Sequence, residues 1–269
     1  MAPLLYEKEG NGAFFAPKTE DFMPRFFVDR SQIRDGIVTI TGDDAFHISR
    51  SLRMAAGERI TVSDKTEFEY DCELVGFSEV VTAKIISTRK LSTEPNFKAT
   101  VYQALVKGDK IDTVIQKSVE CGASAIRLFE SERCIVRKKD DEKKSERRSK
   151  IALEAAKQCG RGIVPEVLPT VSFDDALGFA SGADIKIFCY EGEGTLPLRR
   201  YLSEQATAVS GKIPSVSIII GSEGGFSEGE VERAKKLGFI PVGLGKRILR
   251  TETAAGFVLA ALVYEFELG

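Results

Sequence analysis

This chain has few of the residues that bind metal ions or carry out redox chemistry. Its 269 residues include one histidine, His47, and five cysteines, of which no two share a C-x-x-C spacing. A single histidine excludes metal sites built on two histidines, and the cysteine spacing argues against zinc and dithiol redox sites. We therefore expect buried, reduced thiols in a cytoplasmic protein, no bound metal, and no hydrolase that depends on histidine.

Long apolar runs and the common nucleotide-binding fingerprints are also absent. No stretch of about eighteen apolar residues occurs, so no segment is expected to span a membrane. Residues 1–23 carry acidic side chains and no long apolar core, which is not the pattern of a secretory signal and predicts a loose extension. Neither G-x-G-x-x-G nor glycine–lysine–serine/threonine is present, which argues against a Rossmann-type oxidoreductase.

The composition is that of an ordinary globular protein, long enough for one large domain or two ordinary ones. Hydrophobic residues make up 43% and charged residues 29%, and the net charge is −2. Any nucleic-acid contact must therefore come from a local basic patch. One candidate is the stretch from Arg133 to Lys150, which carries nine Lys or Arg against four acids.

The periodicity of the chain changes near residue 90. Short β-branched runs at 36–40, 59–62, 70–75 and 80–87, with a short helix ending near Gly57, predict a β-rich first part, followed by a linker at 88–96. Beyond it, strands are expected at 99–106, 126–129, 185–190, 216–220 and 240–244, and helices at 111–121, 151–159, 196–205, 228–237 and 254–267. This alternation predicts an α/β domain with a mostly parallel sheet covered on both faces.

Three of the predicted strands end in unusual loops, at the edge where parallel sheets bind ligands. The loops are residues 190–194, 221–226 and 245–253. In the second, Gly-Ser-Glu-Gly-Gly-Phe, glycines let the backbone approach a ligand closely, and Glu223 would repel a phosphate. A ligand with a cation or hydroxyls, such as a sulfonium, an amine or a ribose, fits better.

Each loop also has a purely structural interpretation. Ser227 and Glu230 have the spacing of a capping box, so the glycine loop could simply be a well-formed turn from strand to helix. In the third loop, Ile248 and Leu249 either anchor the loop or form a slot for a flat ring. Thr251 and Thr253 could cap the last helix, Glu252 would lie near its N-terminus, and Arg250 would be left to face an anion.

The stretch IGSEGGF, followed by LGKRILRTETA, strongly resembles the RsmE family of 16S ribosomal RNA uridine-N3 methyltransferases, in the SPOUT superfamily. Lys107 and residues 116–122, 131–133 and 154–161 agree with this pattern. His47-Ile48, Leu52-Arg53 and Gly57-Glu58 match the PUA-like RNA-binding domain of the family. The resemblance covers residues 24–269. It departs from the family at Ser222, where proline is usual, and at Cys121, where leucine is usual.

The resemblance implies a fold and a partner. An N-terminal extension (1–23) would precede a small PUA-like β-barrel domain (24–91) and a SPOUT methyltransferase domain (97–269) whose parallel sheet contains a deep trefoil knot. The protein would be a homodimer that uses S-adenosyl-L-methionine to methylate N3 of one uridine in 16S ribosomal RNA, within the small ribosomal subunit. The modest net charge favours recognition of the assembled subunit over free RNA.

The resemblance also assigns roles to residues. The donor would be bound by residues of the three loops and the last helix: Tyr190, Glu191, Gly221, Glu223, Gly224, Gly225, Leu244, Gly245, Ile248, Leu249, Thr251, Glu252, Thr253 and Ala254. Arg250, then Arg161, are the candidates for stabilising a uracil anion, and Glu223 or Glu252 could accept the proton or hold the donor. RNA contacts are expected from Arg25, His47, Arg50, Arg53, Lys107, Arg133 and Arg137.

Two other hypotheses remain open from the sequence. The chain could be a different SPOUT methyltransferase, acting on a ribose hydroxyl or a transfer RNA base. It could also be an RNA-binding ribosome-assembly factor whose donor pocket is inactive, although intact glycine-loop and LGKRILRTETA sequences argue against this.

Overall fold

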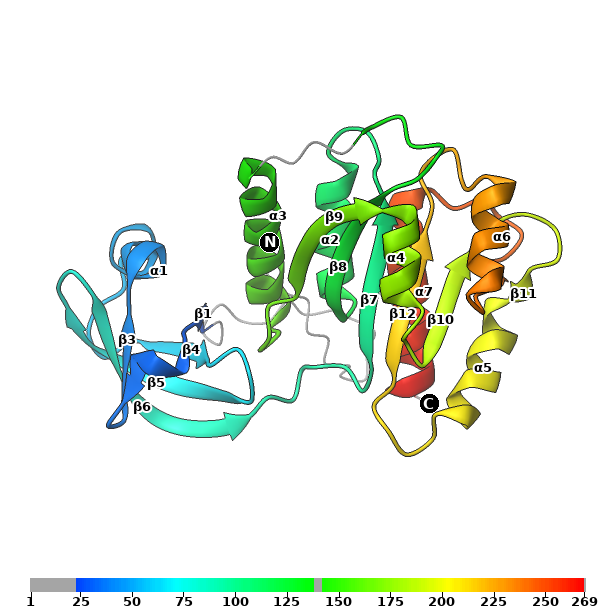
Figure 1. Ribbon diagram of the computed structural model, residues 1–269. Coiled ribbons are helices and arrows are strands. Elements are labelled where there is room, and N and C mark those ends of the chain that lie inside the picture. The colour runs from blue at the N-terminus through cyan, green and yellow to red at the C-terminus, as the bar shows by residue number, and fades with distance from the viewer. Residues whose placement is uncertain (1–22, 138–141, 269) are drawn as a thin grey trace, which may run out of the picture. The chain divides into compact units, whose positions relative to one another are not determined.

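The computed structural model describes residues 23–137 and 142–268, and its contacts divide the chain into two compact units (Figure 1). The first comprises the residues up to Glu94 together with Ala156–Val164, and the second comprises Pro95–Ala155 and Pro165–Gly269. The segment 156–164 thus groups with the first unit, whereas the sequence analysis placed it in the second domain. The predicted extension lies, except for Met23, outside the described residues.

The first unit is built on one six-stranded sheet. Its strands are β1 (Arg25–Phe27), β2 (Ile33–Arg34), β3 (Ile37–Ile40), β4 (Arg59–Ser63), β5 (Phe68–Phe77) and β6 (Val81–Lys90), in the spatial order β1-β4-β5-β6-β3-β2. The β1–β4 pair is parallel and the others are antiparallel. A 3-10 turn (Arg30–Gln32), the short helix α1 (Gly42–Phe46) and a π-helical turn (His47–Ser51) connect them. Because β6 continues to Lys90, the predicted linker at 88–96 is shorter than expected.

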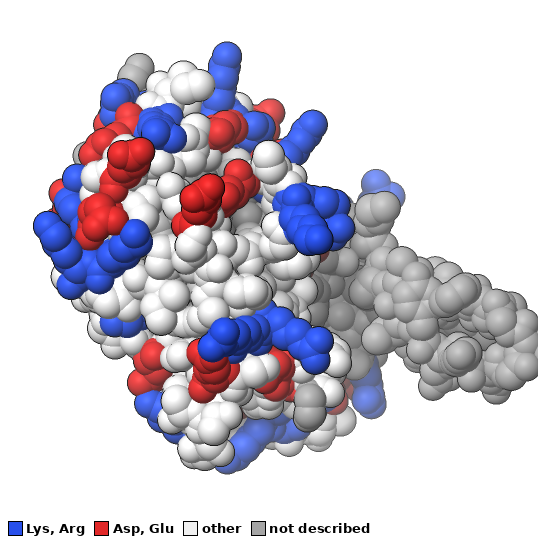
Figure 2. Space-filling view, turned by 90° about the vertical axis from the view of Figure 1, so that its right-hand side faces the viewer, with Lys and Arg blue, Asp and Glu red and all other residues white. Residues whose placement is uncertain are grey.

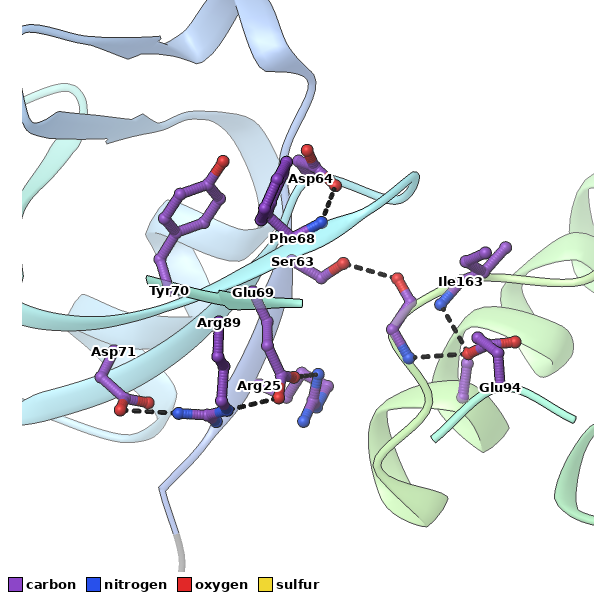
Figure 3. A network of polar contacts seen from close by, with 12 residues as sticks. Arg25, Ser63, Asp64, Phe68, Glu69, Tyr70, Asp71, Arg89, Glu94 and Ile163 are labelled. Atoms are coloured by element: carbon purple, nitrogen blue, oxygen red, sulfur yellow. Dashed lines mark hydrogen bonds and ion pairs between the residues drawn. The ribbon is translucent and has the colours of Figure 1, made fainter. Parts of the chain in front are cut away.

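The turn between β4 and β5 is fixed by a buried carboxylate. Asp64 accepts hydrogen bonds from the backbone N–H groups of Thr66, Glu67 and Phe68 at 2.9–3.0 Å, and its bond with Phe68 is drawn in Figure 3. Burial alone would raise the pKa of Asp64, but these three donors lower it to about 2. The carboxylate therefore stays ionised and holds the hairpin at neutral pH.

The segment after α3 is tied to the first unit by two polar side chains. Glu94 accepts from the N–H groups of Gly162 and Ile163 at 3.0 and 3.1 Å, and Ser63 donates its hydroxyl to the Gly162 carbonyl (Figure 3). These bonds satisfy backbone groups that a non-helical turn would otherwise leave unpaired. They explain why 156–164 separates from the rest of the α/β sequence.

The second unit contains a seven-stranded parallel sheet in the described chain. Its strands are β7 (Lys98–Ala104), β8 (Ala123–Glu130), β9 (Glu166–Ser172), β10 (Ile185–Cys189), β11 (Leu196–Pro197), β12 (Ser215–Ile220) and β13 (Ile240–Gly243), in the order β11-β13-β10-β12-β7-β8-β9. The helices are α2 (Lys110–Glu120), α3 (Glu142–Cys159), α4 (Phe173–Ala180), α5 (Leu198–Ala208), α6 (Glu228–Lys236) and α7 (Thr251–Phe266). Helices α2 and α7 pack together on one face and α4 covers the other (Figure 1), which confirms the expected parallel sheet with two covered faces.

Several elements differ from the sequence expectation. Strand β9 and helix α4 were not predicted, and β9 contains Pro169, which an edge strand tolerates. Helix α3 begins at Glu142, whereas the sequence analysis expected a start near residue 151. The early start was missed because the first turns are charged, exposed and without apolar periodicity. Helix α7 begins at Thr251, three residues before the expected start.

The predicted capping box of α6 is confirmed and does more than cap. Ser227 Oγ accepts from the Glu230 N–H at 3.2 Å, and Glu230 accepts from the Ser227 N–H at 2.9 Å. Glu230 is fully buried and also accepts from Ser131 Oγ and the Glu132 N–H. One carboxylate therefore joins the loop after β8 to the start of α6.

Removing the capping hydroxyl is expected to destabilise this unit. Ser227→Ala should lower the free energy of unfolding by about 1 kcal/mol, since the Glu230 N–H loses its acceptor. Urea denaturation measures this change. Ser203→Ala, at an exposed position of α5, is the matched control and should stay within about 0.5 kcal/mol of the parent. Equal effects of the two substitutions would contradict the capping role.

Candidate functional site

The three loops singled out in the sequence line one cavity of about 480 Å³ in the second unit. Twelve of the fourteen residues predicted to bind the donor line it: Tyr190, Glu191, Gly221, Glu223, Gly224, Gly225, Leu244, Gly245, Ile248, Leu249, Thr251 and Ala254. Glu252 and Thr253 are not among its lining residues. The loops after β10, β12 and β13 therefore form one site, as the carboxyl ends of neighbouring parallel strands should.

The cavity also involves residues that the sequence analysis did not assign to it. These are Arg133, Cys189, Thr195, Ile220, Ser222, Phe226, Glu228, Gly243, Lys246 and Arg247. Most adjoin a predicted residue in sequence, so a wider reading of the same loops would have found them. Arg133 comes from the loop after β8, and nothing in its local sequence signals that it reaches the cavity.

Phe226 anchors the glycine loop in the core of the unit. Its ring centroid lies 4.5 Å from that of Phe188, 5.7 Å from that of Phe173 and 6.4 Å from that of Phe129. Phe226 is 4% exposed, so the residue that ends the loop is held as firmly as a core residue. The glycines before it can then remain at the cavity wall without a hydrophobic anchor of their own.

The glycine loop is a tight turn that side chains would disrupt. The Gly225 N–H donates to the Ser222 carbonyl at 2.9 Å, and Gly225 has φ +65°, a conformation that favours glycine. A Cβ on Gly224 would lie 3.1 Å from the backbone oxygen of Arg133. The loop is packed against the β8 loop from behind, which leaves its other side to the cavity.

Thr251 connects three chain segments beneath the cavity. Its hydroxyl donates to the Gly221 carbonyl at 2.7 Å and accepts from Gln103 Nε2 at 2.8 Å. The expectation that Thr251 caps α7 is therefore wrong: Arg250 occupies the N-cap position, without a side-chain cap, and Thr251 is the first helical residue. Its side chain instead fixes the third loop to the second.

Glu223 projects from the glycine loop and is paired. Its carboxylate lies 2.6 Å from Lys110 Nζ, at the first residue of α2, and both side chains are about one-third exposed. Partial burial would raise the pKa of Glu223, but the hydrogen bond and charge of Lys110 outweigh burial and lower it. The group is thus held as a carboxylate, which suits a cation better than it suits a proton acceptor working near neutral pH.

The two predicted catalytic arginines belong to different units and have different surroundings. The Arg250 side chain is 84% exposed and lies 3.9 Å from Glu252. Glu252 is in the first turn of α7, as expected, and its Oε2 is buried without a hydrogen-bond partner in the described part of the chain. Arg161 belongs to the first unit, is 4% exposed and bonds to Glu94 through Nε and Nη2. This buried ion pair argues against a catalytic role for Arg161, because breaking it would strand the Glu94 charge.

The residues predicted to bind RNA fall into two groups. His47, Arg50, Arg53 and Lys107 are exposed. Arg25 is largely buried against Glu69 at 2.6 Å, Arg133 donates to the Gly224 carbonyl at 3.1 Å, and Arg137 pairs with Glu130 at 2.7 Å. Arg25 is therefore poorly placed to meet a phosphate. Residues 138–141 of the basic stretch lie outside the described residues.

Basic side chains are clustered on the face that Figure 2 shows. Figure 2 shows Lys and Arg side chains gathered in separate clusters beside a broad uncharged band. Within the described chain, no group of three or more His, Cys, Asp or Glu side chains is arranged to hold a metal ion, and the cysteines there are unbridged. None of the helices between residues 23 and 268, leaving out 138–141, has the length and apolar character needed to cross a bilayer.

Comparison with known proteins places this site in a family. Residues 93–263 match the model of an RNA methyltransferase domain, and residues 40–87 match that of an RNA methyltransferase PUA domain. The chain is 36% identical to the ribosomal RNA small subunit methyltransferase E of Bacillus subtilis, over 91% of this chain and 98% of that protein. The chain belongs to the RsmE family.

Solved structures of RsmE-like proteins have the same architecture. A structure of the Neisseria gonorrhoeae ribosomal RNA small subunit methyltransferase E, bound to S-adenosyl methionine, is 30% identical and has a TM-score of 0.77, covering 90% of this chain and 97% of that one. A putative methyltransferase from Legionella pneumophila, in complex with the same cofactor, is 29% identical with a TM-score of 0.79 over the same shares. The expected combination of a PUA domain with an α/β methyltransferase domain is confirmed.

The Thr251 hydroxyl should be required for stability around the RsmE-type cavity. Thr251→Val keeps the β-branched shape but removes both hydrogen bonds, and we expect a loss of about 1–3 kcal/mol in the free energy of unfolding. Chemical denaturation provides the measurement. Thr251→Ser keeps the hydroxyl and should recover most of the loss; a serine variant as unstable as the valine variant would rule out the hydrogen bonds as the cause.

Lys110 should control the ionisation of Glu223. In Lys110→Met the pKa of Glu223 should rise, because the partner that stabilises the carboxylate is gone. In the parent, the stabilisation from this pair should be present at neutral pH and lost as the pH falls below about 4.5, the ordinary value for glutamate, through the lowered pKa. A ¹³C NMR titration of the carboxyl reports the shift.

Lys117→Met is the control for this titration. Lys117 lies on the same helix and pairs with Glu120 at 2.7 Å. Its loss should leave the titration of Glu223 where it is in the parent. If Glu223 titrates at the same pH in the Lys110 variant and the parent, Lys110 does not set its ionisation.

Proposed function

We propose that this protein transfers a methyl group from S-adenosyl-L-methionine to N3 of one uridine in the 16S ribosomal RNA of the small ribosomal subunit. The observation that carries the proposal is the single cavity made by the three loops, in a chain of the RsmE family. Relatives of the same architecture have been solved with S-adenosyl methionine bound.

The lining of the cavity suits that donor. A volume of about 480 Å³ lies within the range of small-molecule sites, about 300–1,000 Å³. Glu191, Glu223 and Glu228 are among its lining residues, and their negative charge favours the cationic groups of the donor. The glycine backbone at 224–225 offers polar atoms without side chains in the way. Leu244 and Leu249 supply apolar wall for a flat ring. Bound there, the donor supplies an electrophilic methyl group.

The target nitrogen must be made nucleophilic by the protein. N3 of uridine carries a proton at neutral pH and is as weak an acid as the phenol of tyrosine, with a pKa of about 10. Arg250 is the group we assign to the developing uracil anion, since its side chain is 84% exposed and its ion pair with Glu252 is long, at 3.9 Å. Arg161, held by Glu94, is not used.

The two candidate carboxylates have different surroundings. Because the ion pair with Lys110 keeps Glu223 ionised, we assign this carboxylate to holding a cation of the donor. Glu252 has one buried oxygen without a hydrogen-bond donor in the described chain, on the first turn of the helix that Arg250 caps. We therefore propose Glu252, which lies beside Arg250 although it does not line the cavity, as the proton acceptor.

Further parts of the proposal rest on the family resemblance. The active form would be a homodimer in the cytoplasm, the chain would pass through a deep trefoil knot near its C-terminal end, and no metal would take part. The RNA-contacting side chains would include the exposed His47, Arg50 and Arg53 in the PUA domain and Lys107 and Arg133 beside the cavity.

The test is to identify the methylated nucleoside. The purified protein is incubated with methyl-labelled S-adenosyl-L-methionine and unmodified small subunits, and the RNA is digested to nucleosides. Label should appear in 3-methyluridine. Arg250→Ala should slow transfer by about 10²–10³-fold while still binding the donor. Arg199→Ala, an exposed arginine on α5, is the control and should retain activity.

Other outcomes would revise the proposal. Label in a 2′-O-methylated nucleoside, or only in transfer RNA, would assign another SPOUT reaction. Donor binding without transfer to any RNA would favour the assembly-factor hypothesis. Failure to bind the donor would refute the assignment of the cavity.

A further inference from the structure

The third loop carries a row of exposed side chains, of which only Ile248 was assigned to the donor. We call Lys246, Arg247, Ile248 and Arg250 the basic lip. All four are exposed, and Ile248 is 84% exposed. Lys246, Arg247 and Ile248 also line the cavity, so the lip lies at its mouth.

Two cations of the lip, Lys246 and Arg247, are unpaired in the described chain, and the third, Arg250, has only a long ion pair with Glu252. In the described chain, Lys246 and Arg247 make no hydrogen bond or ion pair, and the nearest carboxylate oxygen to Arg250 is 3.9 Å away. By contrast, Lys110 is bonded to Glu223 and Arg133 to the Gly224 carbonyl. Three neighbouring like charges repel one another, so a bound anion would stabilise the lip.

The ends of the lip are fixed although its side chains are not. Gly245, with φ +110°, makes the turn out of β13, and the hydroxyl of Thr251 holds the other end to Gly221. The backbone between them is only five residues long. The loop thus presents its side chains from a defined place, which lowers the entropy lost on binding.

The lip does not suit the donor itself. S-adenosyl-L-methionine carries a sulfonium, an ammonium and one carboxylate, a net positive charge, and three cations at the mouth would repel it. The carboxylates of Glu191, Glu223 and Glu228 are the groups that favour a cationic ligand. A polyanion is the partner that matches the lip.

An exposed isoleucine among the cations narrows the choice to an unpaired strand. Phosphates of any nucleic acid could bind Lys246, Arg247 and Arg250. The side chain of Ile248 instead offers an apolar contact, which the face of a base could make. The faces of bases are covered by stacking in a duplex and become available when a nucleotide is unstacked or splayed out.

From this arrangement, and resting on the proposed function, we infer that the basic lip binds a single-stranded RNA segment around the target uridine. Lys246 and Arg247 would hold phosphates of that segment, and Ile248 would pack on a base. Arg250 would then face the nucleotide that reaches the cavity.

The experiment measures binding of a fluorescein-labelled single-stranded RNA of about 16 nucleotides containing one uridine, over a range of salt concentrations. Each phosphate contact contributes about 0.7 to the slope of log affinity against log salt for single strands. The double variant Lys246→Ala/Arg247→Ala should therefore reduce the slope by about 1.4. Ile248→Ser should weaken binding several-fold at an unchanged slope.

Two controls define the result. Arg199→Ala removes an exposed arginine on α5 and should leave both affinity and slope unchanged. Donor binding, measured by calorimetry with S-adenosyl-L-methionine, tests whether Lys246 and Arg247, which also line the cavity, act on the donor instead of on RNA. The inference is overturned if the slope stays at the parent value, if donor binding weakens and RNA binding does not, or if a duplex of the same sequence binds as tightly.

Failure of this inference can be told from failure of the proposed function. If the parent protein forms 3-methyluridine and the double variant keeps its salt slope, only the lip assignment is wrong. If the parent forms no 3-methyluridine but the slope falls as expected, the lip binds RNA and the proposed reaction is wrong.

Discussion

One hydroxyl group holds the functional end of the α/β sheet together. Thr251 Oγ1 donates to the Gly221 carbonyl and accepts from Gln103, so it joins the ends of β12 and β7 to the first turn of α7. These segments are far apart in sequence, and two of them carry loops that line the cavity. The glycine loop and the lip are consequently fixed relative to one another, and the shape of the cavity depends on this junction as much as on its lining.

The cavity is lined by side chains of both charges. Glu191, Glu223 and Glu228 line it together with Arg133, Lys246 and Arg247. A cationic donor and a polyanionic RNA therefore both find side chains of the opposite sign in one cleft, although the whole chain has a net charge of only −2. The arrangement explains how RNA could be handled locally without an overall basic protein.

The features that could be predicted from the sequence are those set by residues close together in the chain. The central strands are β-branched runs such as 216–220, and the glycine loop and the capping box of Ser227 have their own spacing, so the sheet, the loops and most of the cavity lining could be anticipated. Strand β9 was missed because it contains a proline at a sheet edge. The role of Thr251 as a cap was wrong, and the ion pair of Arg161 was not foreseen, because their partners, Gly221 and Glu94, are 30 and 67 residues away and only the tertiary fold brings them together.

Hydrogen–deuterium exchange with and without S-adenosyl-L-methionine tests the central claim most directly, since it reports on all three loops at once. The account predicts protection in residues 190–196, 221–226 and 244–251 together, extending into the first turn of α7. Protection confined to one loop, or found instead in residues 25–90, would contradict a single site built from the three strand ends and held by Thr251.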